Sequence, residues 1–95
     1  MKSVLTTTKG ICYRCQKQGY TELHHIIHSG CNKKRQERMG LIVYLCPDCH
    51  RGTYGVHGKN GHDIDLDLKK IAQKMYEEKH SREEWMNEIG RNYLD

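Results

Sequence analysis

The sequence predicts a single small α+β domain, and three observations lead to this fold class. Residues 41–45 (Leu-Ile-Val-Tyr-Leu) form the clearest strand pattern in the chain. The last third of the chain instead carries apolar residues at helical spacing. Two Cys-x2-Cys pairs flank the β-prone half. A chain of 95 residues with 36% apolar content and no Phe can bury only a thin core, so a bound metal would contribute much of its stability.

The two cysteine pairs have the spacing of a structural zinc site. A Cys-x2-Cys turn directs two thiolates at one tetrahedral ion, and a second such turn completes a closed site. Two disulfides are the alternative. We expect reduced thiols in the cytoplasm, because residues 1–10 lack the apolar run of a signal peptide and no stretch of about 18 apolar residues predicts a membrane span. The expected ligands of the structural Zn²⁺ are Cys12, Cys15, Cys46 and Cys49. Cys31 has no partner at this spacing and is expected to be a free thiol.

The first 62 residues hold the predicted strands. Residues 20–27 are β-prone, and residues 33–39 favour a short helix that Gly40 ends. Pro47 suits the first turn of a further helix, because that position has no use for a backbone donor. Glycines at every third position from Gly52 to Gly61 then disfavour a regular helix. Residues 1–10 are polar and are expected to form a flexible tail.

Residues 63–95 predict two helices. Three aspartates that favour the positive end of a helix precede apolar residues at helical spacing, namely Leu68, Ile71, Ala72, Met75 and Tyr76. A second helix begins at Ser81, which opens a Ser-Arg-Glu-Glu capping box. Trp85, Ile89 and Tyr93 follow at every fourth position and define one face. We expect both helices to pack on the core without a direct chemical role.

Histidines are concentrated in the middle of the chain. Six of the seven fall between His24 and His62, although an ordinary polar role remains the expectation for most of them. His24, His25 and His50 differ because of their positions relative to the cysteine pairs. A regular strand would point His24 and His25 to opposite faces, so one shared metal centre requires the strand to end or distort there.

Positive charge is concentrated in the same part of the chain. Residues 1–62 hold ten Lys and Arg residues against three acidic ones, whereas residues 63–95 hold six against nine. Basic residues near the histidines favour contacts with a polyanion such as nucleic acid, and a solvated basic loop is the alternative. The residues expected to bind nucleic acid are Lys33, Lys34, Arg35, Arg38 and Arg51.

The order of these motifs resembles the HNH endonuclease family in its four-cysteine form. The matching pieces are Cys-x2-Cys from Cys12, Leu23-His24-His25-Ile26, Asn32-Lys33-Lys34, Gly40-Leu-Ile-Val-Tyr-Leu-Cys-Pro-Asp-Cys-His50 and Gly55-Val56-His57. They are similar to small HNH proteins of phages and prophages. The resemblance implies a zinc-stapled ββα-metal core of the HNH (His-Me finger) type within residues 11–62, followed by C-terminal helices in residues 63–95. It also implies a phage- or prophage-encoded protein of a bacterial host cell.

The resemblance implies specific roles for the site residues. His25 matches the general base, and His24 and His50 match ligands of a catalytic divalent metal. His57 matches either a third ligand or a substrate contact. The family's middle Asn has no counterpart at the aligned position, where Gly40 or Leu41 stands, and Asn32 is the best substitute. Imidazole ligands favour Mn²⁺, Ni²⁺, Co²⁺ or Zn²⁺ over Mg²⁺.

The implied activity is metal-dependent hydrolysis of DNA phosphodiester bonds. DNA is the expected partner, with phage packaging or recombination proteins as further candidates, no membrane, and the oligomeric state left open. A zinc-ribbon module that binds DNA or protein without cutting is the main alternative, since it shares the cysteines and the basic residues. It gives no reason for His24, His25 and His50 to be grouped. A structural or inhibitory phage protein on an inactive HNH scaffold is a third interpretation.

Overall fold

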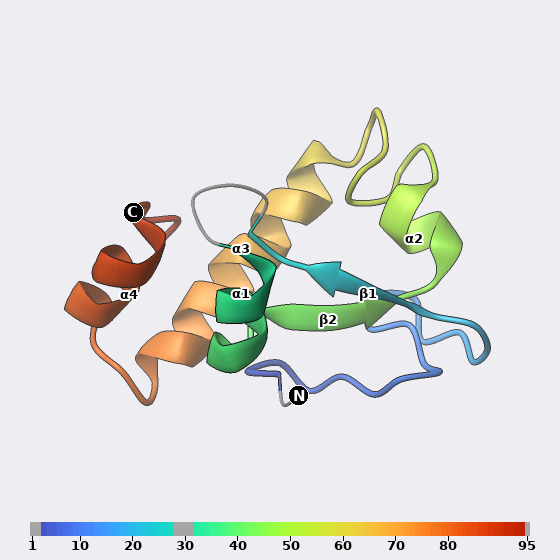
Figure 1. Ribbon diagram of the computed structural model, residues 1–95. Helices are drawn as coiled ribbons and strands as arrows, with labels where there is room; N and C mark the ends of the chain where they lie inside the picture. The colour runs from blue at the N-terminus through green and yellow to red at the C-terminus, as the bar shows by residue number, and fades with distance from the viewer. Residues whose placement is uncertain (1–2, 28–31, 95) are drawn as a thin grey trace.

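The computed structural model describes residues 3–27 and 32–94, and these residues form a mixed α+β fold around a two-stranded sheet (Figure 1). The elements are, in order, β1 (Glu22–His25), α1 (Lys33–Met39), β2 (Ile42–Leu45), α2 (Pro47–Arg51), α3 (His62–Glu77) and α4 (Arg82–Ile89). The strands are antiparallel, with His24 opposite Val43 and His25 opposite Ile42. The predicted α+β class is confirmed, with both strands shorter than their apolar patterns.

α1 is held at both ends and along its inner face. The Asn32 side chain accepts a hydrogen bond from the Arg35 backbone N–H at 2.8 Å, and Gly40 ends the helix with a φ of 81°. The buried Gln36 side chain accepts from the Ile27 N–H at 2.9 Å and donates to the Ile27 carbonyl. α1 is therefore fastened to the chain just after β1.

The glycine-rich segment after α2 winds back along that helix. The Val56 N–H donates to the Cys49 carbonyl at 2.9 Å, and the His57 N–H donates to the His50 carbonyl at 2.8 Å. A Cβ at Gly58 would lie 1.8 Å from the Gly52 carbonyl oxygen, so only glycine fits this close approach. The segment is not helical, as its glycines predicted, and it fixes His57 beside His50.

α3 and α4 contribute further buried residues to the core. α3 passes behind α1 in Figure 1, and its residues Leu68, Ala72 and Tyr76 join the sheet residues in one buried cluster. Ile71 and Met75, which share the predicted spacing, are each 37% exposed and lie at the margin of that face.

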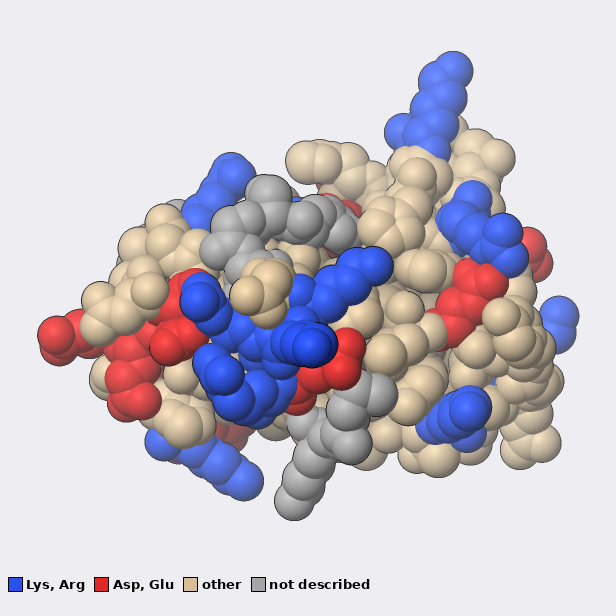
Figure 2. Space-filling model, viewed as in Figure 1, with Lys and Arg blue, Asp and Glu red and all other residues tan. Residues whose placement is uncertain are grey.

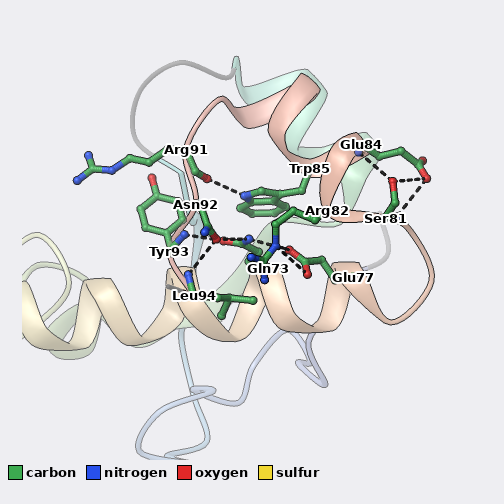
Figure 3. Close-up of polar contacts among 10 residues, drawn as sticks. All are labelled: Gln73, Glu77, Ser81, Arg82, Glu84, Trp85, Arg91, Asn92, Tyr93 and Leu94. Atoms are coloured by element: carbon green, nitrogen blue, oxygen red, sulfur yellow. Dashed lines mark hydrogen bonds and ion pairs between the residues drawn. The ribbon is translucent and has the colours of Figure 1, made fainter.

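The predicted capping box is present at the start of α4, where Ser81 accepts from the Glu84 N–H at 3.1 Å (Figure 3). The helix ends before Tyr93, because Gly90 adopts a φ of 81°. The spacing predicted that Tyr93 would extend the apolar face of α4, but Tyr93 lies beyond the end of the helix. Its N–H donates to the side chain of Gln73 on α3 at 2.7 Å, and the Trp85 indole donates to the Arg91 carbonyl at 2.7 Å (Figure 3).

The N-terminal segment, for which the sequence predicted a flexible tail, makes specific contacts with the sheet in the structure. From residue 3 onward the segment lies along the outer edge of β2, where the Val4 N–H donates to the Gly40 carbonyl at 2.8 Å and the Tyr44 N–H donates to the Thr7 hydroxyl at 3.1 Å. Leu5 is buried in the core. The segment covers backbone groups that an edge strand would otherwise expose. None of the helices that the structure describes is both long and apolar enough to span a membrane.

Candidate metal centres and the histidine cavity

The four cysteines of the two pairs converge into one cluster, called here the cysteine cluster. Their sulfur atoms all lie within 4.8 Å of one another, and Cys15 Sγ is 3.8 Å from Cys46 Sγ. Four thiolates at about 2.3 Å from one tetrahedral zinc would be about 3.8 Å apart. All four are free thiols in the structure, so the disulfide alternative does not apply to them. The predicted grouping is confirmed, and the cluster could hold a structural zinc.

The electrostatics of the cysteine cluster also suit a cation. Burial raises the pKa of Cys12, but hydrogen bonds from the backbone amides of Cys15, Cys46 and Arg14 outweigh it and lower the pKa to about 6. Burial and the neighbouring thiols raise the pKa of Cys49 to about 12. One thiolate therefore forms readily while another thiol resists ionisation beside it. A divalent metal would remove this conflict, because thiols are deprotonated when they coordinate it.

Three histidines form a second cluster, called here the histidine group. His24 on β1, His50 on α2 and His57 on the glycine-rich segment have ring centroids 4.8 to 5.1 Å apart. Each offers a ring nitrogen within 4.8 Å of the other two. Ligands about 2.1 Å from one ion lie about 3 to 4 Å apart, so small ring rotations would close this group on a metal. His57 thus lies where a third ligand would be.

Glu22 supports the histidine group from outside. Its Oε1 lies 2.8 Å from Nδ1 of His50, and its carboxylate also accepts from Arg51 Nε and Nη2 at 3.0 and 2.7 Å. Hydrogen bonds from Arg51, and then His50, hold the pKa of Glu22 below its usual range. An ionised carboxylate requires the proton on Nδ1, which leaves Nε2 of His50 to coordinate a metal.

Glu22 was not predicted from the sequence, although a signal for it exists. It lies two residues before His24, and residues two apart in a strand share a face. The same contact gives Arg51, which was expected to bind nucleic acid, a second role as a partner of Glu22. Its guanidinium pairs with Glu22, although its side chain is still 65% exposed.

His25 and the histidine group share one cavity, called here the histidine cavity. Its volume is about 570 Å³, and its lining includes His24, His25, Asn32, Lys33, His50 and His57. For His24 and His25 to face one site, the strand has to end or distort at these residues. β1 does end at His25. Nε2 of His25 lies 2.9 Å from Oε2 of Glu37 on α1.

Asn32 and the basic residues border the histidine cavity. Asn32 lines it while its side chain caps α1, so the structure gives it a folding role beside the expected catalytic one. An adjoining hollow of about 380 Å³ is lined by Asn32 and by the α1 basic cluster of Lys33, Lys34, Arg35 and Arg38. Figure 2 shows basic side chains gathered over α1. Lys33 lines both spaces, and Arg35 pairs with Glu88 at 3.5 Å.

Among the residues that the structure describes, His62 and His80 do not join either cluster. His62 is exposed at the start of α3, and His80 stacks on Tyr76 with centroids 4.4 Å apart, as expected for ordinary polar positions. Cys31 and His28 lie outside the residues that the structure describes.

Comparisons with family models, with curated proteins and with solved structures found no match to this chain. Its function therefore has to be inferred from the residues and the geometry of the two clusters.

Proposed function

We propose that the protein is a metal-dependent DNA endonuclease of the HNH type, with the ββα-metal core formed by β1, β2 and α2. The observation that supports this most is the histidine cavity, because it joins a histidine outside the ligand group to three histidines that can share one ion. His24 and His25 lie on β1, His50 lies on α2, and His57 lies on the segment after α2, in the order that the resemblance implies. A zinc-ribbon module would need only the cysteine cluster.

The donor set of the histidine group fits a transition ion such as Mn²⁺, Ni²⁺, Co²⁺ or Zn²⁺ better than Mg²⁺. Three protein ligands leave coordination positions open, as in catalytic sites. A metal bound there would polarise a phosphoryl oxygen and stabilise charge on the leaving oxygen.

The chain's own residues supply the rest of the proposed chemistry. His25 accepts a proton from water in the cavity, and general-base help of this kind contributes about 10² to 10⁴ in rate. Glu22 holds the His50 ring in the ligating tautomer. The α1 basic cluster binds phosphates next to the scissile one, since it borders the same cavity.

The test is incubation of supercoiled plasmid with purified protein and Mn²⁺, Ni²⁺, Co²⁺ or Mg²⁺, with chelator as the control. Nicked or linear product that depends on metal is the expected result. DNA binding with no product under any metal would instead support the zinc-ribbon module.

The α1 basic cluster gives a prediction about affinity. Replacing Lys33, Lys34 and Arg35 with Ala should weaken DNA binding and reduce the slope of log K against log salt concentration by about 0.9 for each phosphate that the variant no longer neutralises. Fluorescence anisotropy at several salt concentrations measures the slope. The matched control replaces Lys70, Lys74 and Lys79, which are exposed on or just after α3. This triple replacement removes the same amount of positive charge. Equal effects of the two triple variants would show that only net charge matters.

The glycine-rich segment gives a prediction about the second metal. Gly58→Ala should displace the segment, because its Cβ would meet the Gly52 carbonyl at 1.8 Å, and His57 would move with it. Loss of one imidazole ligand should weaken metal binding at the histidine group by about 10-fold or more, by analogy with the 10- to 100-fold effects of outer-shell changes. Isothermal titration with Co²⁺ or Zn²⁺ measures this. Lys59→Ala, an exposed change at the next position, should leave the affinity unchanged.

A further inference from the structure

We propose that Glu37 is the positioning residue for His25. Its carboxylate accepts the hydrogen of Nε2 and thereby holds the imidazole in the tautomer whose Nδ1 is free to accept a proton. This inference rests on the proposed function, in which His25 is the general base.

The contact between the two side chains is short and partly shielded. Oε2 of Glu37 lies 2.9 Å from Nε2 of His25, and the side chains are 33% and 16% exposed. An ionised carboxylate can only accept hydrogen bonds, so this contact requires a hydrogen on Nε2. In neutral imidazole the other nitrogen then carries the lone pair. Within the described residues, the structure contains no hydrogen bond to Nδ1 of His25.

α1 fixes the position of the Glu37 carboxylate relative to β1. Gln36, the preceding residue, is 1% exposed and binds both backbone groups of Ile27, two residues after His25. Asn32 and Gly40 cap the two ends of the helix. Two consecutive α1 residues therefore fasten the two ends of the 25–27 segment, one through the backbone and one through the His25 ring.

This restraint matters because β1 ends at His25. A histidine at the end of a strand has fewer neighbours to fix its ring, and a free imidazole exchanges between two tautomers. Only one of these presents an accepting Nδ1. In hydrolases that use a serine–histidine pair, a carboxylate on the far nitrogen performs the same selection for the base. Glu37 is not among the residues that group around a metal in the described chain, so its carboxylate is available for this role.

The role can be tested without cleavage, through the ¹⁵N and ¹H resonances of the His25 ring in protein loaded with Zn²⁺. Wild-type protein should show the Nε2–H tautomer, and Glu37→Ala should add a substantial Nδ1–H population. Ala is the best helix former, so α1 and the thermal transition should be retained. Glu88→Ala is the matched control, because it removes a carboxylate that pairs with α1 but does not contact His25. An unchanged tautomer in Glu37→Ala would overturn the proposal.

Kinetics then test whether this positioning serves the reaction. In plasmid cleavage, Glu37→Ala should lower kcat by about 10-fold or more with KM within about 2-fold, since it affects the base and not the phosphate contacts. A changed tautomer with unchanged kcat would overturn the catalytic part. Absence of cleavage by the wild type would instead reject the nuclease, and the ring resonances would still show whether Glu37 sets the tautomer.

Discussion

His25→Ala is expected to lower plasmid cleavage by about 10² or more, while the fold, the zinc content and DNA affinity stay close to wild type. The side chain is removed from the histidine cavity, but the three residues of the histidine group remain. The variant therefore loses the proposed base and keeps the proposed ligands. Single-turnover cleavage at saturating metal measures the chemical step directly.

Ligand variants separate this effect from loss of metal. His24→Ala and His50→Ala should bind the second metal more weakly, so excess metal should restore part of their activity. Excess metal should not restore the His25 variant, because it refills the metal site but cannot replace the missing general base. His62→Ala changes an exposed histidine on α3 outside the cavity and should cut like wild type. If His25→Ala cuts plasmid as fast as wild type, the proposed mechanism is wrong.

The features that could be predicted from the sequence are those written in short segments. Each Cys-x2-Cys pair defines its own turn, the Ser81 capping box marks a helix start, and Gly40 marks a helix end. The glycine-rich segment after α2 was predicted to be irregular for the same reason. Each of these features depends on the backbone preferences of neighbouring residues. They can therefore be predicted without knowing the contacts between distant segments.

Contacts between distant segments could not be predicted in this way. Glu22 reaches His50 across 28 positions, and Glu37 reaches His25 across 12. Both acids are ordinary polar residues in the sequence, and only the pairing of β1 with β2 and the docking of α1 bring them to the histidines. The contacts between the N-terminal segment and β2 were not predicted for a similar reason. The order of this segment comes from hydroxyl and backbone bonds to β2, which a polar Thr-rich stretch does not reveal.

Cys46→Ser is expected to abolish cooperative folding. Cys46 is 8% exposed, lies between β2 and α2, and places its sulfur 3.8 Å from that of Cys15. A structural zinc contributes about 10 to 16 kcal/mol in zinc-finger peptides at neutral pH, which matches or exceeds the 5 to 15 kcal/mol by which whole domains are stable. With a thin core, this chain has no reserve to replace it. Circular dichroism on heating, with zinc content measured in parallel, tests the expectation.

The substitution Cys46→His distinguishes loss of a ligand from loss of a small buried side chain. Imidazole also coordinates zinc in tetrahedral sites, so this variant should recover part of the zinc affinity and of the thermal transition, whereas Cys46→Ser should recover neither. Both are best compared in the His50→Ala background, because zinc at the histidine group would otherwise add to the measured content. A sharp transition and one equivalent of tightly bound zinc in the Cys46→Ser, His50→Ala protein would contradict the structural role of the cysteine cluster. The β1–β2–α2 unit would then have to be held by its apolar contacts alone.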